Sequence, residues 1–245
     1  YLSSNIGIEI LNKGGNAVDA AVAVGFSLAI TLPRAGNLGG GGFMLIYMKD
    51  KKEIFYIDYR SNSPLNSNIK DLFNTKLPRD YKKTDFNKSK YGYKASAVPG
   101  TVAGLLEAHT NFGKLPLDEV MAPVIRQAEE GILVSYDLSK AIESTPQLLN
   151  DSESKRIYFK DGSPLKENSL MKRPDLAKTL KLISRNGKSG FYEGEIANKF
   201  VAAMNNNNGF MTLKDLKSYK VNSGAPINAL YRNHLVFAPG APSGG

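Results

Sequence analysis

The sequence predicts a mixed fold of the α/β (α+β) class, in which a β-hairpin lies among many helices. Three observations predict this class. Apolar residues recur at helical spacing through most of the chain, and two aromatic-rich runs flank a short polar connection, as in antiparallel strands. In addition, 42% of the 245 residues are apolar, which is enough for a sizeable core. No repeat or linker divides the chain, so we interpret it as one domain with a helical elaboration.

The first two predicted helices are separated by a pair of glycines. Residues 4–13 have helical spacing, and Asn16 is placed to cap a second helix over residues 17–31, with Asp19 completing a capping box. This second helix is apolar on nearly every face and ends before Pro33, so we expect it to be buried on both sides.

A β-hairpin is predicted after a run of four glycines. Residues 43–48 and 54–60 are short apolar runs, rich in aromatic residues and joined by a polar connection. The first run shows no alternation of apolar and polar residues, so we expect that strand to be covered on both faces. Residues 61–94 are polar, with scattered apolar anchors, and predict a long loop.

The second half of the chain is predicted to be mainly helical. Pro174 stands at the first position of one helix, and Thr212 begins a capping-box pattern that opens a short one. Two short strands are expected around Arg232 and Asn233. The predicted helices of this half cover residues 101–109, the segment that Gly131 closes, and residues 135–149, 174–185 and 193–204.

The composition argues against several classes of function. The chain has no cysteine, which excludes thiolate nucleophiles, disulfides and cysteine-type zinc sites. His109 and His234 stand in no metal-binding spacing, so we expect structural or surface roles for them, and neither a metal nor a cofactor. The net charge of +9 comes from scattered lysines, which disfavours a nucleic-acid partner. No apolar stretch predicts a membrane span, no targeting segment is visible, and the abrupt ends suggest a fragment or a processed piece.

The four glycines at residues 39–42 require a reason, because glycine costs backbone entropy. Phosphate-binding loops run from a strand through glycines to a helix, whereas this run follows a helix and precedes a strand. A nucleotide site is therefore disfavoured. We favour a close approach of the backbone to its neighbours over a plain connector.

Arg60 is the candidate binding residue, because it ends the second predicted strand and is followed by a loop. A guanidinium there offers two parallel N–H donors to a carboxylate. The alternative is an ion pair with Asp58 or another acid. Side chains alternate along a strand, so Asp58 and Arg60 would share a face, and Asp58 could instead hold the guanidinium in place for a ligand.

Several stretches of the sequence match one family when they are taken together and in order. They are GIEILNKGGNAVDAAVAVGFSLAITLP, GGGGFML, IDYRSNSP, SAVPGTVAG, GKLPLDEVMAPVIRQAEEGILVS, GFMTLKDLKSYK and YRNHLVFAPGAPSGG. In this order they resemble the N-terminal region of the gamma-glutamyltranspeptidases, within their large subunit. The resemblance runs almost end to end, so residues 1–245 are interpreted as a single partial domain.

The resemblance implies an N-terminal nucleophile hydrolase with an αββα sandwich. Such enzymes are made as zymogens that cut themselves into a large and a small subunit, and the new N-terminal Thr of the small subunit is the nucleophile. It takes the γ-glutamyl group from glutathione or a related compound and passes it to water or to an amine. By motif match, Arg60 corresponds to the arginine that holds the α-carboxylate of the substrate. Bacterial members are mostly periplasmic or secreted, which gives the expected location.

The sequence departs from the family pattern in two places near the expected site. Ser61 follows the arginine where the family often has an acid, and the proline-rich stretch reads APGAPSGG. The sequence stops at Gly245, before the expected position of the nucleophile, so this chain contains no catalytic residue and alone is expected to be inactive. Alternatives are a family relative that acts on poly-γ-glutamate or on cephalosporin side chains, and a non-catalytic relative that keeps the scaffold.

Overall fold

The computed structural model describes residues 1–68 and 90–243. Residues 69–89 of the long loop predicted over residues 61–94 lie outside the described residues. The α-helices are α1 (Leu2–Asn12), α2 (Ala17–Thr31), α5 (Thr101–Phe112), α6 (Leu117–Glu130), α7 (Tyr136–Glu143), α8 (Ser152–Tyr158), α9 (Pro174–Asn186), α10 (Ser189–Tyr192), α11 (Gly194–Asn206) and α12 (Leu213–Ser218), with 3₁₀ turns η2 (Tyr93–Ala95) and η3 (Pro146–Asn150).

The strands form one three-stranded sheet and several two-stranded pairs. In the sheet, β2 (Glu53–Asp58) lies between β1 (Phe43–Met48) and β7 (Asn222–Gly224), and both neighbours are antiparallel to it. The pairs are β3 (Ile132–Leu133) with β6 (Leu170–Met171), β4 (Phe159–Lys160) with β5 (Ser163–Pro164), and β8 (Ile227–Tyr231) with β9 (His234–Ala238).

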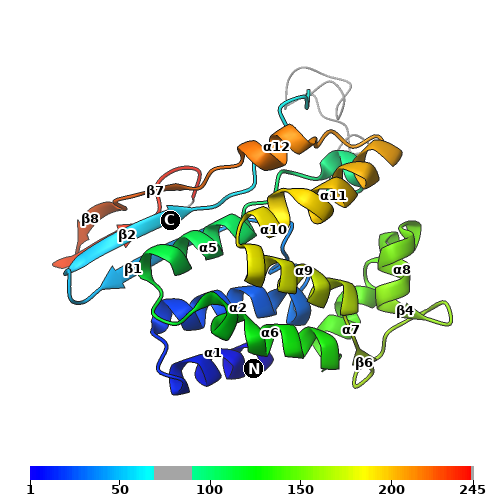
Figure 1. Ribbon diagram of the computed structural model, residues 1–245, viewed down its shortest axis with the longest axis horizontal. Helices are drawn as coiled ribbons and strands as arrows, with labels where there is room; N and C mark the ends of the chain where they lie inside the picture. The colour runs from blue at the N-terminus through cyan, green and yellow to red at the C-terminus, as the bar shows by residue number, and fades with distance from the viewer. Residues whose placement is uncertain (69–89, 244–245) are drawn as a thin grey trace.

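Helices α5, α2, α6 and α1 are stacked on one side of the sheet, as Figure 1 shows. Helix α5 lies against β2, and α2 packs on α5, α6 and α1 in the next tier. Phe26 of α2 and Val124 of α6 are fully buried, as is Leu180 of α9, which packs on α6. Across the described residues, no helix combines the length and apolarity that a membrane crossing requires.

Helix α2 confirms the prediction of a capped, deeply buried helix. The Asn16 side chain accepts the backbone N–H of Asp19, and the Asp19 carboxylate accepts the N–H of Asn16 at 2.9 Å. Asp19 is fully buried and also accepts the N–H groups of Lys114 and Leu115. The capping box therefore joins the start of α2 to the loop after α5.

Strand β1 corrects one prediction, because only one of its faces is covered in this chain. Ile46 is buried toward the helices, whereas Leu45 and Tyr47 on the other face are 39% and 61% exposed. The strand lacks alternation because both faces carry apolar side chains. On the face away from the helices, Leu45 and Tyr47 stay open, whereas Tyr56 of β2, which lies opposite Leu45, is buried.

A second correction concerns the helix predicted over residues 135–149. Ser135 caps α7, but the helix ends at Glu143 and a 3₁₀ turn follows from Pro146. Proline cannot donate the backbone hydrogen bond that a continuing helix needs, so it begins a new turn instead. Helix α8 follows and was not predicted from the sequence.

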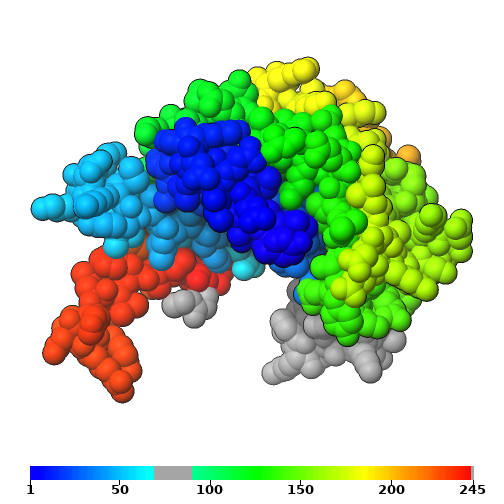
Figure 2. All heavy atoms as spheres, turned by 90° about the horizontal axis from the view of Figure 1, so that it is seen from below, coloured from blue at the N-terminus to red at the C-terminus, as the bar shows by residue number. Residues whose placement is uncertain are grey.

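The predicted pair of strands near the end of the chain is the hairpin β8–β9. Arg232 and Asn233 both have positive φ, at 46° and 62°, which is the backbone conformation of a tight hairpin turn of type I′. Every residue of β8 and the first three of β9 are exposed. Figure 2 shows this orange-red segment projecting from the rest of the molecule.

Candidate functional site

Arg60 lies two residues beyond the end of β2, at the rim of the sheet. Its side chain is exposed, and the guanidinium carbon lies 5.8 Å from the centre of the Phe43 ring. Other arginines, such as Arg34 and Arg156, form ion pairs with acidic side chains. Within the part of the chain that the structure describes, no acidic side chain lies at ion-pair distance from the Arg60 guanidinium.

Asp58 contacts the backbone of Arg60 and not its guanidinium. The Asp58 Oδ1 atom accepts the backbone N–H of Arg60 at 2.9 Å, which forms a local turn at the end of β2. The ion pair with Asp58 considered from the sequence is therefore not found. Burial and the neighbouring Asp58 carboxylate raise the pKa of the Tyr56 phenol, so this side chain stays neutral beside the turn.

The carbonyl of Arg60 is held from the other side of the turn. Tyr219 follows α12, and its hydroxyl donates to this carbonyl at 2.8 Å. Further along, Asn62 and Val98 exchange two backbone hydrogen bonds, and Asp215 Oδ1 accepts the N–H of Leu65 at 2.7 Å. The segment that carries Arg60 is thus fixed at successive positions by residues distant in sequence.

The glycine run packs closely against this segment, as predicted. A Cβ atom on Gly41 would lie 2.5 Å from both the nitrogen of Ser61 and the carbonyl oxygen of Tyr59. A Cβ atom on Gly100 would likewise collide with the same Tyr59 oxygen and with the Tyr219 hydroxyl. Gly41 does not have a positive φ, so it is required here for close backbone approach and not for conformation.

The start of helix α5 lies beside the same turn and is capped by groups far away in sequence. The carbonyl of Gly40 accepts the N–H groups of Gly100 and Thr101 at 2.8 and 3.1 Å. The Tyr192 hydroxyl accepts the N–H of Ala103 at 3.2 Å and donates to the carbonyl of Pro99 at 2.8 Å. These bonds satisfy backbone donors that begin every helix without an internal partner.

The two histidines lie away from Arg60 and have contacts of the kind expected. His109 Nε2 is 2.9 Å from the carbonyl oxygen of Leu115 and 3.9 Å from Asp19 Oδ1, so it ties down the loop after α5. His234 lies exposed in the β8–β9 turn and contacts the carbonyl of Arg232. In the described ranges, no group of three or more His, Asp or Glu side chains is placed to hold a metal ion.

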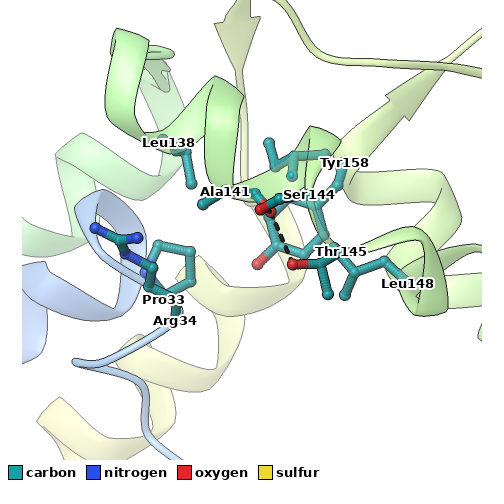
Figure 3. A pocket seen from close by; sticks show the side chains of 9 residues that line it. Pro33, Arg34, Leu138, Ala141, Ser144, Thr145, Leu148 and Tyr158 are labelled. Atoms are coloured by element: carbon teal, nitrogen blue, oxygen red, sulfur yellow. Dashed lines mark hydrogen bonds between the residues drawn. The ribbon is translucent and has the colours of Figure 1, made fainter.

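A hollow of about 320 Å³ lies elsewhere, between the segment after α2 and helices α7 and α8 (Figure 3). Its polar groups already have partners, because the hydroxyls of Ser144 and Thr145 donate to the carbonyl of Ala141 and the Arg34 guanidinium pairs with Asp137. The hollow therefore offers mainly apolar surface. Its lining is Pro33, Arg34, Leu138, Ala141, Ile142, Ser144, Thr145, Leu148 and Tyr158.

Sequence reasoning predicted Arg60 as a binding residue and Asp58 as a neighbour that could hold it, but it missed Tyr219 and the contact of Asp215 with Leu65. The capping box at Thr212 and Asp215 was predicted, yet its link to Leu65 was not. Tyr219 was not singled out, because a single tyrosine in a polar stretch carries no local signal of a contact 159 residues away.

The arrangement around Arg60 suits the binding of an anion. A planar cation with two parallel donors is exposed on a rigid backbone, beside an aromatic ring that covers part of its surroundings. A carboxylate matches this donor geometry.

Comparison with known proteins identifies the relatives of this chain. A family profile described as Gamma-glutamyltranspeptidase matches residues 3–245. The glutathione hydrolase proenzyme of Escherichia coli (strain K12) is 40% identical over 245 residues, which is 99% of this chain and 41% of that protein. The chain thus spans less than half the length of this curated relative.

Solved structures show the same likeness. The gamma-glutamyltranspeptidase of Helicobacter pylori matches with a TM-score of 0.90 and 36% identity over 99% of this chain and 68% of that chain. The gamma-glutamyltranspeptidase of Pseudomonas nitroreducens, complexed with L-DON, matches with a TM-score of 0.88 and 35% identity over 99% and 69% of the two chains. A cephalosporin acylase from Bacillus halodurans is 26% identical, with a TM-score of 0.85 over 96% and 44%.

Proposed function

Because this chain belongs to the gamma-glutamyltranspeptidase family, we propose that the complete protein transfers or hydrolyses the γ-glutamyl group of glutathione and related compounds. The N-terminal nucleophile hydrolase fold class expected from the sequence is confirmed, and this chain contributes a helical layer and a three-stranded sheet to it. The curated relative is a proenzyme of which the chain spans 41%, so the remaining parts of the reaction are assigned to chain outside these residues.

In the proposed reaction, this chain binds substrate and another segment of the same precursor performs the chemistry. The hydroxyl of an N-terminal Thr in a small subunit attacks the γ-amide carbonyl, the amine leaves with a proton, and an acyl-enzyme remains. Water or an acceptor amine then takes the γ-glutamyl group and restores the hydroxyl. The role of Arg60 is to hold the α-carboxylate, so that the amide lies at a fixed distance from the nucleophile.

The observation that carries this proposal is the state of Arg60. Its guanidinium is exposed and has no acidic partner among the described residues, while its backbone is held by Asp58 and Tyr219. A cation kept in place but left unpaired can bind an incoming carboxylate without first breaking an ion pair. A charge-assisted bidentate contact of this kind contributes about 1.5–3 kcal/mol, or about one to two powers of ten in affinity.

The proposed partner is the small subunit from the same precursor, and the uncovered surfaces support it. The open face of the sheet exposes Leu45 and Tyr47, and β8–β9 exposes Leu230 and Leu235. Isolated two-stranded hairpins are marginally stable in water, so β8–β9 needs a further surface to pack on. We assign that surface to the rest of the precursor. The precursor would be a zymogen that cuts itself, made by a bacterial cell and located in the periplasm or secreted.

The alternative specificities have less support than γ-glutamyl transfer or hydrolysis. The cephalosporin acylase is less similar than the gamma-glutamyltranspeptidases described above, and the substrate contacts that would separate poly-γ-glutamate from glutathione are assigned to the absent subunit. A non-catalytic relative would have no reason to keep a held and unpaired arginine at the rim of the sheet.

The experiment that tests the proposal replaces Arg60 in the full-length protein. Arg60→Ala is expected to raise the KM for γ-glutamyl-p-nitroanilide about 10- to 100-fold, and Arg60→Lys to recover little, because a point charge cannot reproduce the fork of donors. Self-cleavage, followed on a denaturing gel, should remain. An unchanged KM in a processed Arg60→Ala protein would remove Arg60 from the site.

A further inference from the structure

We propose that Tyr219 is a positioning residue for substrate binding, because its hydroxyl fixes the peptide that carries Arg60. The inference rests on the proposed function, in which Arg60 binds the α-carboxylate of the γ-glutamyl substrate. The Tyr219 hydroxyl donates to the carbonyl of Arg60 at 2.8 Å. It therefore acts on the substrate only through the orientation of Arg60.

Tyr219 is itself buried and held by two contacts, so its hydroxyl has a defined position. The residue is 3% exposed, and its ring stacks on the ring of Tyr192 with 5.8 Å between centres and 6° between planes. Its backbone carbonyl accepts the Lys188 ammonium at 2.7 Å. A side chain fixed in this way can impose a position on its neighbour.

The Tyr219 hydroxyl is also kept in the form that donates a proton. Burial, together with the negative charge of Asp58, raises the pKa of this phenol to about 12. At neutral pH the phenol is protonated, and it donates a hydrogen bond to the Arg60 carbonyl.

The peptide of Arg60 is held on both sides and has little room to adjust. Asp58 accepts its N–H, Tyr219 donates to its carbonyl, and Gly41 and Gly100 lie against the adjoining backbone. Loss of the Tyr219 hydroxyl leaves the carbonyl without that donor, and the peptide can then tilt. Because the guanidinium lies at the end of a long side chain, a small tilt displaces it, and misplacement by about 1 Å is costly in such sites.

The first test is Tyr219→Phe in the full-length protein, with two competitive inhibitors as probes. L-glutamate carries the α-carboxylate, and 4-aminobutyrate is the same molecule without it. We expect the inhibition constant of L-glutamate to rise about three- to tenfold, that of 4-aminobutyrate to stay unchanged, and kcat for γ-glutamyl-p-nitroanilide to change less than twofold.

Tyr192→Phe is the matched control. The rings of Tyr192 and Tyr219 stack on each other, but the Tyr192 hydroxyl bonds to Pro99 and Ala103 at the start of α5 and not to Arg60. This variant should lower the melting temperature as much as Tyr219→Phe does, with the ratio of the two inhibition constants unchanged. A ratio that changes equally in both variants would reduce Tyr219 to a general structural role and overturn the inference.

A second variant covers the case in which Tyr219→Phe does not fold or process. Lys188 is exposed, and Lys188→Met removes the tether on the Tyr219 carbonyl together with the contact of the ammonium with the Tyr192 ring, whose centre lies 5.6 Å away. We expect a smaller rise in the inhibition constant of L-glutamate, about twofold, with no change for 4-aminobutyrate. If Tyr219→Phe gives no folded protein, the inference is overturned by a processed Lys188→Met protein in which the inhibition constant of L-glutamate does not rise.

The same assay separates failure of this inference from failure of the proposed function. If Arg60→Ala affects both inhibitors equally, Arg60 does not bind the carboxylate and the proposed function of this site is wrong. If Arg60→Ala weakens only L-glutamate while Tyr219→Phe weakens neither, only the positioning role of Tyr219 is overturned. In the Arg60→Ala background, Tyr219→Phe should have no further effect on the ratio, because the two residues act as one unit.

Discussion

The segment around Arg60 and the hairpin β8–β9 are both local turns of backbone, yet they differ in how they are held. Asp58, Tyr219 and Asp215 bond the backbone of residues 60–65, and glycines pack against it. In the hairpin, the ladder bonds between β8 and β9 are present, but Leu230 is 73% exposed. The first region is completed within this chain, and the second needs a surface from elsewhere.

The difference shows that geometry and stability can have separate sources. The turn at Arg232 and Asn233 determines the register of the hairpin locally, without any burial. The position of the segment that carries Arg60 depends instead on contacts across 150 and 159 residues of sequence. In this chain, the candidate binding residue lies in the region that is already fixed before any partner is added.

The largest effect is expected from crowding the fixed region. Gly41→Ala places a Cβ atom 2.5 Å from backbone atoms of Tyr59 and Ser61, which cannot rotate away as a side chain would. We expect a loss of about 3 kcal/mol in the free energy of unfolding and a rise in KM of about tenfold. Urea unfolding and steady-state kinetics of the full-length protein measure both.

Gly40→Ala is the matched control within the same glycine run. A Cβ atom there meets nothing nearer than 3.5 Å, which is ordinary contact, and Gly40 does not have a positive φ. It should be close to neutral in both measurements. Equal effects of Gly40→Ala and Gly41→Ala would mean that flexibility of the run, and not close packing, is what matters.

The next effect tests whether the hairpin is covered in the complete protein. In the complete protein, Leu230→Gln should lower the free energy of unfolding by about 2 kcal/mol, because the stabilisation from burying the leucine side chain is lost. Leu170, in the short strand β6, is 56% exposed and offers a comparable site on a two-stranded pair. Leu170→Gln should cost less than about 0.5 kcal/mol. If Leu230→Gln and Leu170→Gln have equal, small effects on urea unfolding, the hairpin is not covered in the complete protein.

The smallest effect concerns acid, through Asp215. Burial opposes the charge of this side chain, but hydrogen bonds from the Leu65 N–H and from Thr212 lower its pKa below the ordinary value of 3.8. A lowered pKa in the folded state means that the stabilisation is complete above about pH 4 and is lost as pH falls through the folded pKa.

Asp215→Asn should therefore cost about 1.5 kcal/mol at pH 7, because one of its bonds to Leu65 or Thr212 is lost. The difference from the unaltered protein should shrink as pH falls from 3.8 through the lower folded pKa, because Asp215 is protonated first in the unfolded state and then in the folded state. Urea unfolding at pH 7, 5 and 3 measures the trend. A difference that persists unchanged at pH 3 would show that charge at Asp215 is not the cause.

Local signals in the sequence predicted those parts of the fold that local chemistry determines. The capping boxes at Asn16 and Thr212 and the turn at Asn233 were all found where residue types require them. The predicted helix over residues 135–149 failed at Pro146, where a helix-breaking residue lies inside an otherwise periodic pattern.

What the sequence could not reveal is contact across long separations. Arg60 was predicted from its place at a strand end and from a family motif, but Ser61 left its support unexplained. The structure supplies that support through the backbone, from Asp58 and Tyr219. The prediction that both faces of β1 are covered was wrong for a related reason. Apolar residues such as Tyr47 indicate that a face can be buried, but they do not indicate which segment covers it.

The most direct test of the central claim is a crystal structure of the processed, full-length protein with bound L-glutamate. We predict two nitrogens of the Arg60 guanidinium at hydrogen-bond distance, about 2.7–2.9 Å, from the α-carboxylate oxygens, with the Tyr219 bond to the Arg60 carbonyl retained. A bound glutamate whose α-carboxylate is held by other residues, with Arg60 still lying over Phe43 in solvent, would contradict the account.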